Sequence, residues 1–207
     1  LRGEGGALIT VGSIASELPT PIMGAYAASK HAIRGYVRSL RIELQTDAPS
    51  VSVTLVKPSG IDTPIGQHSL NREGGEAQIP PPVYDPQLVA DAILACAAFP
   101  RREVTVGGAG RAQVLFGEHF PTLFEKLAPI MGKLLTDRTR DQPGPANLFA
   151  SARAGLARSG EHAPRTTSLY TTAQLNPMAS ATIVSAGLAV GAIALIELLR
   201  PRPRAKG

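Results

Sequence analysis

Three residues near the start of the chain, Ser13, Tyr26 and Lys30, carry side chains that could perform acid–base chemistry on a carbonyl or hydroxyl group. Tyr26 and Lys30 are four residues apart, so on a helix they lie on one face, about a turn from each other. An ammonium at that distance stabilises the phenolate, which prepares the phenol to give a proton to a carbonyl oxygen and to take it back. Ser13 could donate a second hydrogen bond to the same oxygen, on which charge develops in the transition state.

The segments around these residues predict a strand followed by a helix. The apolar run over residues 7–11 favours a buried strand that ends just before Ser13. Apolar residues then recur at intervals of three, four or seven from residue 24 to about residue 46, which is typical of an amphipathic helix. Active-site groups favour the carboxyl ends of strands in open α/β sheets, so the order of strand, serine and helix indicates a reductase.

This arrangement resembles the short-chain dehydrogenase/reductase family, whose catalytic serine stands thirteen residues before the tyrosine, as Ser13 stands before Tyr26. The family's frequent pair of serines corresponds here to Gly12 and Ser13. The resemblance implies an α/β fold, a Rossmann-like doubly wound parallel sheet, and hydride transfer between NAD or NADP and a small-molecule carbonyl or alcohol. It also implies that Lys30 holds the nicotinamide ribose, and that a homo-oligomer forms through the helix of Tyr26 and Lys30.

A second segment resembles the family's Pro-Gly-x-x-x-Thr turn, which lies along the nicotinamide. It follows the β-branched run over residues 51–56, which predicts a strand. The resemblance implies that five residues of this turn bind the cofactor: Pro58, Ser59, Gly60, Ile61 and Thr63. Ser59 stands where the family has glycine, and Gly60 beside it could adopt an unusual dihedral angle.

The segment over residues 65–86 is rich in polar residues, glycine and proline, which predicts a loop. In the resembled family this place is the substrate lid, so His68 and Tyr84 are candidates for substrate contact. Beyond it we expect a helix from residue 87 to 99 and a last strand from residue 103 to 107.

The sequence holds only the last three strands that the resembled fold requires. The glycine cluster at residues 107–110 follows a late strand and lacks the spacing of a pyrophosphate-binding turn. We therefore expect the chain to be the carboxyl-terminal half of a larger enzyme and to be inactive alone. The phosphate-binding half and the family's catalytic asparagine are then expected elsewhere.

The pattern divides the chain into four parts: the half domain over 1–110, a helical extension over 111–136, a flexible linker over 137–178 and a hydrophobic helix over 179–200 with a basic tail over 200–207. The uncharged run within the last part would be about 27 Å long as a helix, which makes it a candidate membrane anchor. A helix that packs on a soluble protein is the alternative. We expect a cytoplasmic protein, with this helix as its possible membrane contact.

Composition excludes several other classes of protein. Cys96 is the only cysteine, which excludes a disulfide framework and a zinc site, and no metal is expected. The net charge of +5 is scattered or terminal and aromatic residues make up 4%, so nucleic-acid binding is not expected. Two alternatives stay open, namely an epimerase of the same fold and a non-catalytic, membrane-attached interaction fragment.

Overall fold

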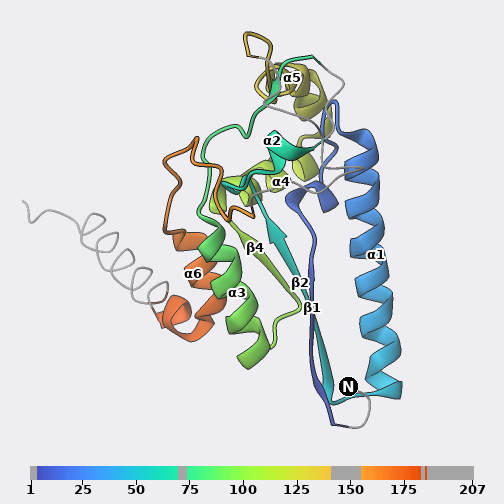
Figure 1. Cartoon of the computed structure of the whole chain (residues 1–207). Helices are drawn as coiled ribbons and strands as arrows, with labels where there is room; N and C mark the ends of the chain where they lie inside the picture. The colour runs from blue at the N-terminus through green and yellow to red at the C-terminus, as the bar shows by residue number, and fades with distance from the viewer. Residues whose placement is uncertain (1–3, 70–73, 141–154, 183–184, 186–207) are drawn as a thin grey trace, which may run out of the picture.

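The chain forms a three-stranded parallel sheet with helices on both faces (Figure 1). The structure is a computed structural model and describes residues 4–69, 74–140, 155–182 and 185. The strands β1 (Gly6–Val11), β2 (Val51–Pro58) and β4 (Glu103–Val106) lie in the order β1-β2-β4. This is the Rossmann-like α/β architecture that the sequence predicts, with the three expected strands.

Helix α1 (Gly24–Asp47) covers one face of the sheet, and α3 (Pro86–Ala98) covers the other (Figure 1). The apolar positions of α1 explain its orientation, because Val37, with Ile33 and Leu44 beside it, packs on Val53 and Leu55 of β2. On the other face, an apolar cluster joins α3 to β2 and β4: Val56, Ala92, Cys96, Val104 and Val106. Both faces of β2 are therefore buried, as expected of a parallel strand between helices.

The range expected as a helical extension, 111–136, contains α5 (Pro121–Lys133) and most of α4 (Gly108–His119), which begins three residues before it. Both helices pack against the segment after β1, where η1 (Ile14–Ser16) and Leu18 lie. The lid contains α2 (Ile65–His68) and β3 (Glu76–Ala77), and β3 pairs antiparallel with β5 (Thr136–Asp137) after α5. The extension is thus joined to the lid.

We expected residues 137–178 to be a flexible linker, but the described part of this range contains a helix and packs against other elements. It contains α6 (Leu169–Leu175), which packs against α3 and β4, and a segment over 155–168 that contacts the lid. Residues 141–154 lie outside the described residues. So does most of the expected hydrophobic helix over 179–200, and among the described residues no helix is long and apolar enough to cross a membrane.

Candidate functional site

Ser13 lies two residues beyond β1 and begins η1. Its Oγ accepts a hydrogen bond from the backbone N–H of Ala15 at 3.1 Å, and its own N–H donates to Ser16 Oγ at 3.3 Å. Such a cap fixes the position of the oxygen. Because Oγ is the acceptor in this contact, its hydroxyl proton remains available for donation to a ligand. Ser13 is 9% exposed, so this donor is largely buried.

Tyr26 and Lys30 lie in the first two turns of α1, at the carboxyl end of the sheet. Lys30 Nζ is 5.6 Å from the centroid of the Tyr26 ring. It also donates to the backbone oxygen of Val11, the last residue of β1, at 3.4 Å. Tyr26 is 41% exposed, and the described residues give its hydroxyl no hydrogen-bond partner. The phenol and the ammonium are therefore adjacent, and the phenol is open to a ligand.

The turn over residues 58–63 leaves the carboxyl end of β2 beside β4. Ser59 donates to the backbone oxygen of Val106 from its Oγ at 2.8 Å and from its N–H at 2.9 Å. Neither Ser59 nor Gly60 has a positive φ, so the unusual dihedral angle expected at Gly60 is not needed. A Cβ at Gly60 would instead lie 2.9 Å from Cγ2 of Ile79. The glycine therefore allows the lid to approach the turn closely.

The two lid candidates have different surroundings. His68 ends α2, and its ring is partly exposed. Tyr84 is 3% exposed, and its hydroxyl accepts a hydrogen bond from the N–H of Ala109 at 3.3 Å. Its own N–H donates to the backbone oxygen of Gly60 at 2.9 Å. Tyr84 thus lies in the interior and braces the turn, in contrast to the substrate contact that the sequence suggested.

A buried group of charged side chains lies next to the candidate site. Lys57, near the end of β2, is 4% exposed, and its Nζ donates to Glu17 Oε2 at 3.0 Å and to Glu103 Oε2 at 2.7 Å. Two arginines of α1 complete the group, because Arg34 Nη2 is 2.6 Å from Glu17 Oε1 and Arg38 Nε is 2.9 Å from Glu103 Oε1. We call these five residues the Lys57 cluster. It connects β2, β4 and α1 to the segment that follows Ser13.

The charges of the Lys57 cluster compensate one another. Burial acts to raise the pKa of Glu103, but hydrogen bonds from Lys57 and Arg38 lower it from its ordinary value of 4.5 to about 2. A buried ion pair is favourable only when further hydrogen bonds compensate for the lost solvent, and here Arg34 and Arg38 contact the second carboxylate oxygens of Glu17 and Glu103. The cluster therefore holds the elements of the site together.

The segment over 155–168 is joined to the turn over residues 58–63 and to α3. Asp62, which is 1% exposed, accepts a hydrogen bond from Ser159 Oγ, and His162 Nδ1 is 3.2 Å from the same carboxylate oxygen. Arg158 contacts both oxygens of Asp85, the N-cap of α3, with its Nε and Nη2 each at 2.9 Å. The hydrogen bond from Arg158 lowers the pKa of Asp85.

Asp62, Ser159 and His162 do not form a nucleophile-activating triad. Ser159 and His162 both contact Oδ1 of Asp62, and the ring nitrogen near Ser159 Oγ, at 3.3 Å, is also Nδ1. Activation of a serine needs the serine on one ring nitrogen and the carboxylate on the other. These contacts therefore attach the segment to the turn.

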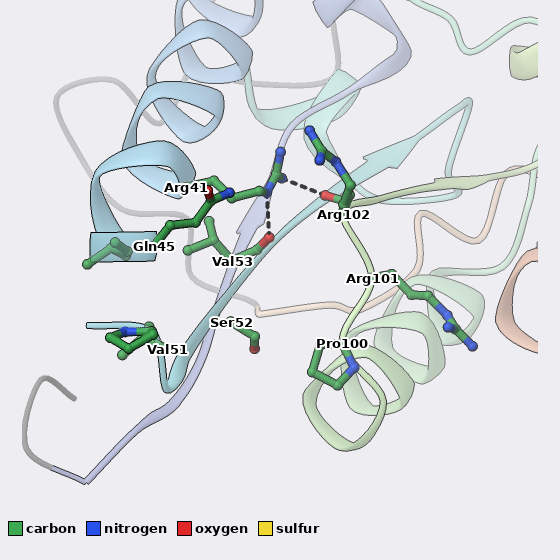
Figure 2. Close-up of a pocket in the computed structure, with 10 residues that line it drawn as sticks. Arg41, Gln45, Val51, Ser52, Val53, Pro100, Arg101 and Arg102 are labelled. Carbon is green, nitrogen blue, oxygen red and sulfur yellow. Dashed lines mark hydrogen bonds between the residues drawn. The ribbon is translucent and has the colours of Figure 1, made fainter. Parts of the chain in front are cut away.

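A hollow of about 310 Å³ lies at the amino end of the sheet, opposite the candidate site (Figure 2). Three arginines line part of it: Arg41, Arg101 and Arg102. Figure 2 shows that Arg41 reaches across the strands, with Nε donating to the backbone oxygen of Val53 at 3.1 Å and Nη2 to that of Arg102 at 2.7 Å. Arg41 thus joins α1 to the starts of β2 and β4, and we assign it a structural role.

Sequence reasoning missed the Lys57 cluster and the contacts of residues 158–162. One signal was present, because Lys57 follows Val53 and Leu55 at alternating positions and so points to the same buried face. A lysine at such a position requires a carboxylate partner. No pattern in the sequence identifies Glu17 and Glu103 as those partners.

Comparison with known proteins shows which family model and which relatives this chain is similar to. A family model described as short chain dehydrogenase matches residues 1–74, which include Ser13, Tyr26, Lys30 and the turn after β2. The oxidoreductase YxnA of Bacillus subtilis is 35% identical over 199 residues, which cover 93% of this chain and 55% of that protein. The 11-beta-hydroxysteroid dehydrogenase A of Sesamum indicum is 34% identical over 94 residues, which cover 45% of this chain and 26% of that protein.

Among solved structures, a short chain dehydrogenase from Burkholderia cenocepacia in complex with NADP is 29% identical, with a TM-score of 0.48. The match covers 66% of this chain and 51% of that one. The matched residues span about half the length of YxnA and about a quarter of the sesame enzyme.

Proposed function

Because the chain belongs to the short-chain dehydrogenase/reductase family, we propose that it carries the proton-transfer site of an NAD(P)-dependent oxidoreductase. The enzyme would interconvert a hydroxyl and a carbonyl group on a small molecule. The observation that carries the proposal is the pairing of Tyr26 with Lys30, whose Nζ is 5.6 Å from the ring centroid, at an exposed end of the sheet. An exposed phenol beside an ammonium suits proton exchange with a ligand.

In the direction of reduction, the Tyr26 hydroxyl gives its proton to the carbonyl oxygen of the substrate. The Ser13 hydroxyl donates a hydrogen bond to the same oxygen, and Lys30 stabilises the phenolate that remains. A nicotinamide, when bound, would supply the hydride for the carbonyl carbon. In the direction of oxidation, the Tyr26 phenolate takes the proton back.

The residues present suit a nicotinamide cofactor. The Lys30 ammonium has three donors, and the described residues accept only one of them, at Val11, so two remain for ribose hydroxyls. We assign cofactor contacts to Lys30 and to the turn that begins at Pro58 and continues through Ser59, Gly60, Ile61 and Thr63. The cofactor is NAD or NADP. His68, on the partly exposed side of the lid, is the remaining substrate candidate.

The phosphates of the cofactor need a further part of the sheet. Among the described residues β1 pairs only with β2, so its second edge is open to another strand. We propose that strands which hold the cofactor phosphates extend the sheet from this edge of β1. The 207 residues alone then have no hydride-transfer activity.

Self-association through α1 is part of the same proposal. Tyr36 and Ile42 on this helix are each 68% exposed, which suits a contact between two copies. Sedimentation of the wild type and of Ile42→Glu tests this contact, because a charge at the centre of such an interface should yield monomers.

The test of function uses the protein with its phosphate-binding part, a panel of ketones and aldehydes, and the absorbance of the reduced nicotinamide. Tyr26→Phe should lower kcat/KM by roughly 10²- to 10⁴-fold and keep cofactor affinity. Lys30→Ala should lower both kcat/KM and the affinity for the cofactor. Tyr170→Phe is the matched control, because it removes an exposed hydroxyl from α6, outside the candidate site and outside α1. Activity that survives in Tyr26→Phe, or falls equally in Tyr170→Phe, would contradict the proposal.

A further inference from the structure

Helix α5 and its two capping residues, Phe120 and Leu134, carry a row of exposed apolar side chains. Its members follow one another at intervals of three and four residues and are 40–61% exposed: Phe120, Leu123, Leu127, Ile130 and Leu134. These intervals place them on one face of the helix. We call this row the α5 stripe. Contiguous apolar surfaces of this kind mark sites of interaction.

The neighbouring side of α5 is packed, so the helix is held in place. Phe124, which is 4% exposed, packs with Ala128 and Met131 against Leu18 and Val114. The apolar surface of α5 therefore has a packed part and an exposed part, and no described residue covers the exposed part. Figure 1 shows α5 at one end of the molecule, beyond the carboxyl ends of the strands. Its open face lies at the periphery of the fold.

The charged residues of α5 lie outside the stripe, and both lysines border it on the same side. Lys126 and Lys133 are seven residues apart and lie about 90° from the centre of the α5 stripe by the helical repeat. Glu125, the one acidic residue of α5, lies on the opposite side of the helix. Both lysines are exposed. Apolar residues bordered by lysines are typical of helices that lie in the interface of a bilayer.

We propose that α5 docks on an anionic lipid bilayer, with the α5 stripe in the boundary of the acyl chains. Lys126 and Lys133 then extend their apolar stems along this surface and reach the lipid phosphates. A second copy of the chain fits this face less well as an antiparallel pair of α5 helices, because the lysines of both copies would lie on the same side of the pair and repel each other.

Docking through α5 would bring the candidate site to the bilayer surface. Leu18, against which α5 packs, follows Ser13 by five residues. This contact is separate from the apolar run over 179–196. All variants below keep residues 179–207, so a difference in binding between two variants reports the contribution of α5.

The first test is sedimentation of the whole chain with vesicles of phosphatidylcholine, alone or mixed with phosphatidylglycerol. The double substitution Leu123→Glu and Ile130→Glu should weaken binding to the mixed vesicles about tenfold or more. The double substitution Lys126→Gln and Lys133→Gln should weaken binding to the mixed vesicles and leave binding to vesicles of phosphatidylcholine alone unchanged. Leu94→Glu, at an exposed leucine of α3, is the control and should bind as the wild type does. Wild-type binding by the Leu123/Ile130 variant would overturn the proposal.

The second test locates the contact directly. The chain has no tryptophan, so Leu127→Trp introduces a single fluorescent reporter in the α5 stripe. Its emission should shift to shorter wavelength with the mixed vesicles and be quenched by bromine-labelled lipid, whereas Leu94→Trp should not respond. An unchanged Leu127→Trp spectrum in vesicle-bound protein would overturn the proposal. A shift that depends on protein concentration without vesicles would also overturn it, because a second copy would then cover the α5 stripe.

Discussion

The candidate site and the Lys57 cluster lie on the same elements, but they use their polar groups in opposite ways. Tyr26 is 41% exposed, and its hydroxyl has no partner among the described residues. Lys57 is 4% exposed, and its Nζ contacts two carboxylates. Arg34 is one turn after Lys30 on α1, and it contacts Glu17 rather than a ligand.

The difference separates groups that act on a ligand from groups that hold the protein together. A group that transfers a proton needs hydrogen-bonding capacity that the fold leaves open. A buried charge is stable only when the fold satisfies that capacity. Substitutions in the Lys57 cluster should therefore change stability, and substitutions at Tyr26 should change activity.

The largest change is expected for Lys57→Met. It leaves the carboxylates of Glu17 and Glu103 buried without their shared cation, which should lower the free energy of unfolding by about 3–5 kcal/mol. Urea unfolding followed by circular dichroism measures this. Lys30→Met is the matched control and should change the free energy by less than about 1 kcal/mol, because Lys30 is partly exposed. Equal losses in the two variants would show that the cluster is not a special source of stability.

The dependence of stability on pH should come partly from Glu103. Its pKa in the fold is about 2, below the ordinary 4.5, so it contributes stability above pH 4.5 that is lost as the pH falls toward 2. Glu103→Gln should give a shallower fall of the free energy of unfolding over this range. Parallel curves for the wild type and Glu103→Gln would mean that the carboxylate does not contribute to acid unfolding.

A smaller change is expected for Arg158→Met, which removes the two contacts to Asp85. Arg158 is half exposed, so the loss should be about 1 kcal/mol in the free energy of unfolding. Arg138→Met, at an exposed arginine, should stay within about 0.5 kcal/mol of the wild type. If Arg158→Met and Arg138→Met change the free energy of unfolding by the same amount, the ion pair between Arg158 and Asp85 does not stabilise the segment over 155–168.

The smallest change in stability is expected for Tyr26→Phe. The substitution removes a hydroxyl that has no partner among the described residues, so the free energy of unfolding should change by less than about 0.5 kcal/mol. The same urea experiment measures this. A loss of more than about 1 kcal/mol would place the Tyr26 hydroxyl among the groups that hold the fold together.

The sequence by itself determined the fold class, the three strands and the pairing of Tyr26 with Lys30. These features depend on residues that are close along the chain. The helical repeat alone places two residues four apart on one face, and a β-branched run alone indicates a buried strand. The family resemblance over the first part of the chain added the expected role of Ser13.

Only the tertiary structure decided which charged residues are buried and paired. Lys57 is 40 residues from Glu17 and 46 from Glu103, and Asp62 is 100 residues from His162. The burial of Tyr84 likewise depends on Ala109, 25 residues away. Periodicity indicates which face of a helix or strand a residue occupies, but not which residues of another element contact that face. Those pairs form only when the strands and helices pack, because packing sets which distant side chains meet.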